Sequence, residues 1–512
     1  MKPYGVTSRR PALAASRRPA LAASRRPALA VTTRTAAFVV VASLGVFDAL
    51  FRIGRATRIT DEVAYVGAGW DYVHGVFTAN LEHPPTAKYL FGVAQLVAGQ
   101  GVTGPRTVVA LAGLAIGLVL FLFLRRPLGY WGGLTAAALW WLTPRANGPT
   151  WYDVATGTPA RIDRLALLDP VMTAFAVVAV AAAWQWTVAA SAGRSSRWWW
   201  AALAGAALAL SATSKVSTAV LVLPLLVLPV LFRRWRDLAL GGALAAAVAV
   251  ALAAVLYLPV GGLDAIAYMV RFQTAHDTTG HLVSVLGRTY LVAPWWTGLL
   301  WALQGLGWPT VVVLGTGTLA ALVVRPDRLV AYLALCLGVL VAFYCTSSVA
   351  LPHYYYAWVP FLVALAAVGF TRLARLRPPW TAVVAALVLA VAVVPGGQLT
   401  TAVAEVRPTG YAVLGRALSA HGYRGGQILF VGVARQTFAV GFGAQGRMQG
   451  VDGRYTAVVE DTDRRFPMSA ALATVIRDHP AAFSAFRVDH LRVWVARTGA
   501  VEVHGSTVVL TP

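Results

Sequence analysis

A cluster of ionisable side chains lies between two long apolar segments near the start of the chain. Within residues 58–92, two adjacent carboxylates, Asp61 and Glu62, are followed by a double proline and then by Lys88. A carboxyl group whose pKa is raised by a neighbouring charge and by an apolar surface can act as a general base on a hydroxyl. A lysine near a helix N-terminus can bind a phosphate. The pattern therefore indicates a reaction that deprotonates one group and binds phosphate on another.

Each of these residues also has a purely structural interpretation. A threonine followed by two acids is typical of a helix N-terminus, where the hydroxyl caps the helix and the carboxylates offset its dipole. Lys88 alone is typical of a lysine that reaches lipid headgroups. Glu82 and His83 are metal ligands by type, so a divalent metal ion is the one cofactor that the sequence suggests, although two adjacent ligands do not define a site. Because the acids occur with the rest of this loop, we favour catalysis by Asp61 and Glu62.

Further polar residues lie beside later apolar segments. Arg161 and Arg164 could bind a lipid-linked phosphate or could pair with nearby acids, and both interpretations stay open. Lys215, a lone cation between two apolar runs, is a further candidate for the phosphate. Tyrosines after residue 352 are typical of a sugar-binding surface, and also of an aromatic belt at a membrane interface. The candidate substrate-binding residues are His83, Asp169, His353, Tyr354 and Tyr355.

The rest of the chain predicts a membrane protein. Of its 512 residues, 58% are hydrophobic and 12% are charged, and the mean hydropathy is +0.66. Many apolar runs approach the roughly 20 residues that a helix needs to cross a bilayer, and helices satisfy their own backbone in lipid. We therefore expect an all-α polytopic membrane protein. The predicted spans are 35–51, 107–124, 131–143, 166–190, 198–213, 216–232, 238–258, 297–324, 328–346, 357–371 and 379–395.

The positive charges indicate how the chain is oriented. The formal net charge is +23, and the lysines and arginines gather in the first 34 residues and in short turns between apolar segments. This distribution follows the positive-inside rule, fits anionic lipids, and argues against a nucleic-acid partner. It predicts about eleven spans in the plasma membrane, with the amino terminus in the cytoplasm and the carboxyl terminus outside. The acidic loop 52–106 then lies on the outer side.

Composition divides the chain into three parts. Residues 1–34 contain a threefold repeat related to SRRPALAA, whose prolines interrupt a helix, and they predict a disordered basic tail. Residues 35–398 form the predicted membrane domain. Residues 399–512 predict a small extracytoplasmic α/β or α+β domain. Its β-rich runs are 427–433, 455–460, 490–496 and 506–510, and its helical patterns lie near 410–420 and 468–478.

The polar loop also resembles a known family signature. Asp61-Glu62 followed by HPPTAK at residues 83–88 is similar to the DE…HPPLGK pattern of protein O-mannosyltransferases. It also resembles the wider set of glycosyltransferases that use phospholipid carriers, including the aminoarabinose transferases of lipid A. The resemblance extends over about residues 35–395. The glycine of the family pattern is alanine here, and the residues before His83 depart from the form typical of the mannosyltransferases.

The resemblance implies a large helical glycosyltransferase fold with its site on the outer face. It implies that a mannose-like sugar, or another hexose or pentose, moves with inversion from a polyprenyl-phosphate carrier to a hydroxyl of a protein, lipid or glycan. Asp61 would be the general base, and Glu62 would orient the acceptor or a metal. Lys88, with Arg161 or Arg164, would stabilise the departing lipid phosphate.

A transporter or flippase of lipid-linked sugars is the alternative function. A charged outer loop could bind the headgroup of such a lipid without catalysis. A transporter would carry polar residues on both sides of the membrane, whereas the unusual polar residues of this chain are predicted to lie on one side. We therefore favour the transferase, with membrane lipids as additional partners.

Overall fold

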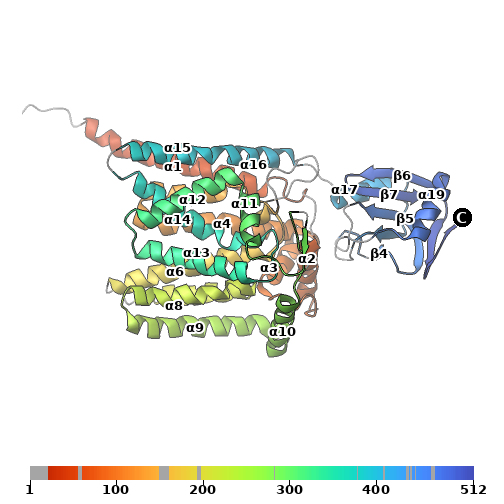
Figure 1. Cartoon of the computed structure of the whole chain (residues 1–512), viewed down its shortest axis with the longest axis horizontal. Coiled ribbons are helices and arrows are strands. Elements are labelled where there is room, and N and C mark those ends of the chain that lie inside the picture. Colours follow the sequence, from red (N-terminus) through yellow and green to blue (C-terminus); the bar gives the residue numbers. More distant parts are fainter. Residues whose placement is uncertain are drawn as a thin grey trace, which may run out of the picture.

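Long helices form most of the molecule. The computed structural model describes residues 21–512 except 56–59, 149–160, 193–197, 282, 287, 377–378, 407–409, 434–437, 439–440, 444 and 463–466. Figure 1 shows these helices running roughly parallel, with a small sheet domain beyond one end of the bundle. The predicted fold class, a helical membrane protein with a small carboxyl-terminal α+β domain, is confirmed.

The bundle is built from helices of unequal length. It contains α1 (Leu21–Leu50), α4 (Thr103–Leu128), α5 (Tyr130–Trp141), α6 (Leu168–Ser191), α7 (Trp199–Ala212), α8 (Val222–Leu231), α9 (Trp235–Tyr257), α12 (Trp308–Val323), α13 (Arg328–Thr346), α14 (Val359–Leu373), α15 (Trp380–Val391) and α16 (Val393–Glu405). Within the described residues, six helical segments are long and apolar enough to cross a membrane, or up to seven with one bent pair, and further apolar helices are shorter. The number of eleven crossings stays a prediction.

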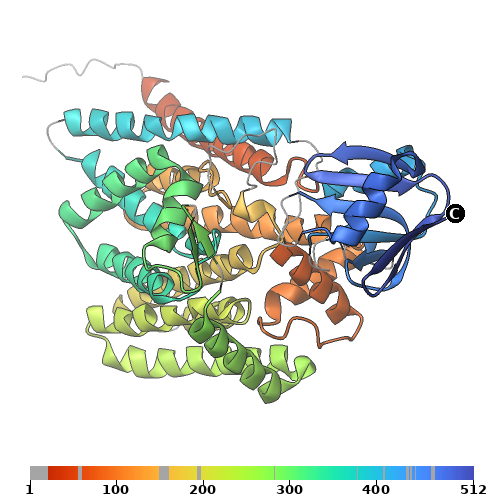
Figure 2. The same cartoon turned by 45° about the vertical axis from the view of Figure 1, so that its right-hand side comes forward.

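Shorter elements gather at the end of the bundle nearest the sheet domain. They are α2 (Thr60–Val73), α3 (Thr86–Ala98), the 3-10 helices η2 (Ile162–Arg164), η3 (Val216–Leu221) and η5 (Tyr354–Ala357), α10 (Gly262–Thr279), the hairpin β1 (Val283–Val285) and β2 (Arg288–Tyr290), and α11 (Thr297–Leu306). Figure 2 shows α2 and α3 beside the sheet domain. This end, which we call the polar end, therefore holds the loop that the sequence singles out.

Arginine-rich turns meet at the opposite end. Tyr130 donates a hydrogen bond to the carbonyl of Arg34, and Arg375 donates one to the carbonyl of Leu128. Arg372 forms an ion pair with Asp327 at 2.7 Å. The structure therefore separates the arginine-rich turns from the acidic loop along the bundle, as the charge pattern predicts.

Three predicted boundaries differ from the structure. The span predicted at 297–324 is two helices, α11 and α12, bent by 109°, because Gly307 adopts a positive φ of 76° and Pro309 restarts the helix. The basic tail was expected to be disordered to residue 34, but α1 begins at Leu21, where alanine, leucine and arginine favour helix. The predicted boundary at 399 falls inside α16.

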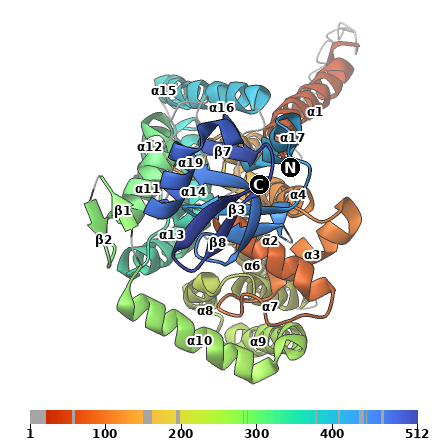
Figure 3. The same ribbon diagram turned by 90° about the vertical axis from the view of Figure 1, so that its right-hand side faces the viewer.

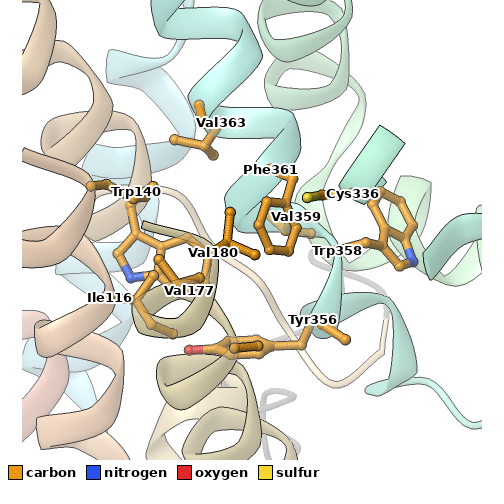
Figure 4. Packing of buried hydrophobic residues seen from close by; sticks show 14 of the residues in the cluster. Ile116, Trp140, Val177, Val180, Cys336, Tyr356, Trp358, Val359, Phe361 and Val363 are labelled. Carbon is orange, nitrogen blue, oxygen red and sulfur yellow. The ribbon is translucent and has the colours of Figure 1, made fainter. Parts of the chain in front are cut away.

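Close packing holds the bundle together. Figure 4 shows Trp140 of α5, Val177 of α6 and Phe361 of α14 in one buried cluster. Small residues let neighbouring helices approach: a Cβ on Gly369 of α14 would lie 1.8 Å from the carbonyl oxygen of Gly317 in α12. Such small-residue contacts are typical of helices that pack in membranes.

In the part of the carboxyl-terminal domain that the structure describes, helices accompany a mixed sheet. Its sheet has the order β4 (Gly446–Met448), β3 (Gln427–Val431), β5 (Gly453–Asp461), β7 (Leu491–Ala496) and β6 (Phe483–Val488), and β8 (Ala500–His504) joins β5 to β9 (Thr507–Thr511). Strand β3 is parallel to β4 and β5, and the other pairs are antiparallel. Helices α17 (Tyr411–Ala420) and α19 (Ala470–Asp478) complete it.

Candidate active site

Lys88 organises the loop that precedes α3. Its ammonium group donates hydrogen bonds to the carbonyl oxygens of Asn80 at 2.5 Å and His83 at 2.7 Å. It also lies 4.9 Å from the centre of the Tyr72 ring. Burial lowers the pKa of Lys88 to about 7. Because Lys88 is fully buried and contacts its own loop, it shapes the chain around His83, and its phosphate-binding role stays a prediction.

Asp169 joins three segments of the chain through one buried carboxylate. Its oxygens lie 2.8 and 3.1 Å from Nζ of Lys215 and 3.5 Å from Nε2 of His353. The ammonium group of Lys215 also lies 3.9 Å from the centre of the Tyr354 ring. Asp169 lies in the first turn of α6, Lys215 lies between α7 and η3, and Tyr354 begins η5. Four predicted site residues, distant in sequence, therefore form one cluster.

A cavity opens beside this cluster. It holds about 570 Å³ of empty space, part of which is continuous with solvent. The helix α10 and the end of α13 form one side of it, and the loop before α3 forms another. Its lining residues are His83, Pro84, Lys215, Val216, Ser217, Gln273, His276, Asp277, Phe343, Tyr344, Ser347, Val349 and Tyr354. A lysine, a carboxylate, imidazole and aromatic rings and hydroxyl groups therefore face one space.

Asp61 lies close to this cluster. It is half-buried in the first turn of α2. Burial lowers the pKa of the His353 ring, and the carboxylates of Asp169 and Asp61 oppose that change. Burial also raises the pKa of Tyr354, and the charge of Asp61 adds to that rise. The charge of Asp61 therefore acts on both rings of the polar cluster.

Tyr65 connects Asp61 to the cavity. It lies one helical turn after Asp61, and its hydroxyl is 3.4 Å from Nε2 of His83, a residue of the cavity wall. Burial, with smaller effects from Lys215 and Lys88, lowers the pKa of His83 to about 3. His83 is therefore a neutral ring at physiological pH, suited to hydrogen bonding with a hydroxyl rather than to binding a phosphate by charge.

Glu62 faces away from Asp61 and joins α2 to α4. Its two carboxylate oxygens accept hydrogen bonds from Arg106 at 2.6 and 2.7 Å, and one of them accepts a third from the backbone of Ala166 at 2.8 Å. Neither Glu62 nor Arg106 is exposed. These bonds give Glu62 a structural role. Its expected role in orienting the acceptor or a metal stays a prediction.

Breaking the Glu62–Arg106 pair is expected to destabilise the protein. The single variant Arg106→Leu leaves an unpaired buried carboxylate, which costs about 3–5 kcal/mol, whereas Glu62→Leu/Arg106→Leu removes both charges and costs less. Thermal unfolding in detergent would compare the two. Equal losses in both variants would contradict a structural role for the pair.

Arg161 and Arg164 have protein partners. Arg161 forms an ion pair with Asp163, and Arg164 donates to the carbonyl oxygens of Asp48 and Phe51 at 2.7 Å each, at the end of α1. Arg145, which the sequence gave no reason to select, binds Asp163 at 2.9 Å. Arg161 therefore pairs with an acid, and Arg164 caps the carboxyl end of α1. Neither residue lines the cavity.

The remaining predicted residues have simpler surroundings. Glu82 accepts a hydrogen bond from Asn80 at 2.6 Å, and Tyr355 donates one to the carbonyl of Ala146 at 2.8 Å, away from the cavity wall. Among the described residues no group of three or more His, Cys, Asp or Glu side chains could hold a metal ion. The suggested metal at Glu82 and His83 therefore stays a prediction.

Sequence reasoning missed several residues of the cavity. Ser217, two residues after Lys215, accepts a hydrogen bond from Tyr344 of α13 at 2.7 Å. Gln273 of α10 donates to the carbonyl of Glu82 at 2.7 Å. The spacing of Tyr65 four residues after Asp61 was a usable signal, because such residues share a helix face. Tyr344 and Gln273 lie in ordinary apolar or polar stretches, and only the tertiary fold brings them to the site.

Comparison with known proteins gives a family match over part of the chain and solved structures with a similar fold. A family model described as dolichyl-phosphate-mannose-protein mannosyltransferase matches residues 158–276, which include Asp169 and Lys215. This match is independent of the motif at 61–88, which lies outside it. The resemblance inferred from the sequence is thereby confirmed. No curated protein matches the chain.

Solved structures share the fold over most of the chain. ArnT from Cupriavidus metallidurans bound to undecaprenyl phosphate has a TM-score of 0.60 at 17% identity, over 90% of this chain and 98% of ArnT. Its apo form has a TM-score of 0.62 at 16% identity, over 91% and 98%. The oligosaccharyltransferase AglB from Archaeoglobus fulgidus, solved with an inhibitory peptide and a dolichol-phosphate, has a TM-score of 0.54 at 11% identity, over 84% and 69%. At these identities the likeness is one of fold.

Proposed function

We propose that this protein is an integral-membrane glycosyltransferase that moves a sugar from a polyprenyl-phosphate carrier to an acceptor hydroxyl outside the cytoplasm. One observation carries the proposal: the Lys215–Asp169–His353 cluster lines or adjoins a cavity at the polar end of the bundle. Asp61 lies one helical turn before Tyr65, whose hydroxyl is 3.4 Å from His83 of the cavity wall. The fold that it shares with ArnT, which was solved with undecaprenyl phosphate, supports a lipid-phosphate donor.

The residues divide the chemistry between two sides of the reacting carbon. Asp61 removes the proton of the acceptor hydroxyl as this oxygen attacks the anomeric carbon. The bond from that carbon to the phosphate oxygen breaks, and the negative charge stays on the lipid phosphate. Lys215 stabilises this charge, while Asp169 holds the ammonium group in place. A single displacement of this kind inverts the anomeric carbon.

The neutral groups of the cavity suit a sugar. His83, Tyr344, Ser217 and Gln273 offer donors and acceptors to hydroxyl groups, and Tyr354 offers an aromatic ring. The types of these residues do not distinguish a hexose from a pentose. The carboxyl-terminal domain lies beyond the polar end of the bundle (Figure 1), where an acceptor on a protein, lipid or glycan would approach. We propose that this end faces outward and that the amino terminus is cytoplasmic.

Mass spectrometry of reaction products tests the proposal. Purified protein in lipid nanodiscs would receive defined polyprenyl-phospho-sugars together with membrane and wall extracts as acceptors. The transferase predicts free polyprenyl phosphate and an acceptor that is heavier by one sugar. A flippase predicts an unchanged donor that moves between leaflets of a liposome. Donor movement without release of polyprenyl phosphate would favour the flippase.

A further inference from the structure

At the polar end, a segment outside the spanning helices exposes apolar side chains. It consists of α10 and the hairpin β1–β2 with the residues that follow it. Figure 3 shows α10 running along the periphery of the bundle, from the end of α9 toward the hairpin. We call residues 262–296 the rim segment.

The rim segment is held firmly on its inner side. Ala265 and Met269 of α10 are buried, and Asp277 accepts hydrogen bonds from the hydroxyl of Ser347 at 3.2 Å and the backbone of Ser348 at 3.0 Å. In the hairpin, Val285 is buried against the same end of the bundle. The segment is therefore packed against the bundle, and its other side chains are exposed on its outer side.

The outer side of the rim segment is unusually apolar. In α10, Leu263 is 81% exposed and Val270 is 53% exposed; in the hairpin region, Leu286 is 73% exposed and Trp295 is 66% exposed. Further exposed apolar side chains are Tyr268, Phe272, Leu291 and Val292. The exposed charged residues among the described part of the segment are Asp264, Arg271, Asp277 and Arg288. Exposed apolar side chains gathered on one segment mark contact with a membrane or with another protein.

The position of the rim segment decides between these two partners. The lipid-facing side of α9, with Val250 and Val255 exposed by 69% and 68%, continues through Leu258 at 76% into Leu263. Exposed apolar side chains therefore occur on both sides of the turn that joins this candidate span to α10. Trp295 and Tyr268 suit the boundary between hydrocarbon and headgroups, where such rings concentrate. A helix with one apolar side that lies across the ends of spanning helices fits the interfacial plane.

We propose that the rim segment is an interfacial anchor that rests in the headgroup region of the outer leaflet. Its partner is the lipid surface. Because Gln273 and His276 of α10 line the cavity, this placement sets the mouth of the cavity at the depth of lipid phosphates. The anchor does not depend on the proposed transfer reaction, since a protein that only binds lipid would place it in the same way.

Spin labels measure this placement directly. Single cysteines replace Leu263, Val270 and Leu286 in a Cys345→Ser background, since Cys336 is fully buried. Matched controls are Val250→Cys in the middle of α9 and Arg477→Cys on the exposed side of α19. In nanodiscs, collision rates with oxygen and with a water-soluble nickel chelate are compared at each label.

The anchor predicts that the three rim labels collide preferentially with oxygen, as Val250→Cys does, while Arg477→Cys collides preferentially with nickel. Rim labels as accessible to nickel as Arg477→Cys would overturn the proposal. Rim labels shielded from both reagents would also overturn it, because shielding would mean that a second copy or another protein covers this surface.

Discussion

Replacing Asp61 by asparagine is expected to lower kcat by a factor of about 10² to 10⁴, the usual contribution of a general base. Asparagine keeps the shape of the side chain and cannot accept the proton of the acceptor hydroxyl. The KM values for donor and acceptor are expected to change little, because the base acts mainly in the transition state. Steady-state kinetics with a defined donor would measure all three parameters.

Asp71→Asn is the matched control for this variant. Asp71 belongs to the same helix, two turns and more from Asp61, and does not line the cavity. It is expected to keep full activity. Both variants should remain monodisperse and keep the melting temperature of the parent protein. Full activity of Asp61→Asn would remove Asp61 from the reaction.

Removing the charge of Lys215 is expected to have the second largest effect. Lys215→Met should lower kcat/KM for the donor by a factor of about 10² or more, because the departing phosphate loses a buried cation. This variant alone also leaves Asp169 buried without its partner, which destabilises the fold. A loss of activity in the single variant therefore has two explanations.

The double variant Lys215→Met/Asp169→Asn separates these explanations. It removes both buried charges, so the melting temperature should recover relative to the single variant. Activity should stay low, because no cation faces the phosphate. Recovery of activity together with stability would mean that Lys215 acts only through the fold.

Local patterns predicted most of the fold. In the carboxyl-terminal domain, the runs at 427–433 and 490–496 match β3 and β7, and both helical patterns match α17 and α19. Alternation and turn residues carry this information over a few neighbours. The strands β4, β6 and β8 were not predicted, because their pairing partners, more than their own residues, define them.

The candidate site was predictable only in part. Asp169, Lys215 and His353 each stood out as charged or polar residues beside apolar segments, but their contact depends on how distant helices pack. Glu62 shows that residues adjacent in sequence can have different surroundings. It is adjacent to Asp61 in sequence, yet successive helical residues point about 100° apart, so Glu62 binds Arg106 while Asp61 points in another direction.

Buried arginines limit the sequence interpretation in a similar way. Arg161 and Arg164 have the charge that a phosphate needs, and composition cannot distinguish a ligand-binding arginine from one that pairs with Asp163 or caps α1. Only their hydrogen-bond partners make that distinction. Lys88 was equally ambiguous until its two carbonyl partners were known.

The most direct test of the central claim is a structure of the Asp61→Asn variant in nanodiscs with a polyprenyl-phospho-sugar trapped before transfer. The account predicts that the phosphate binds Lys215 inside the cavity and that the anomeric carbon faces residue 61. A donor phosphate bound elsewhere in the protein, with the cavity empty, would contradict it.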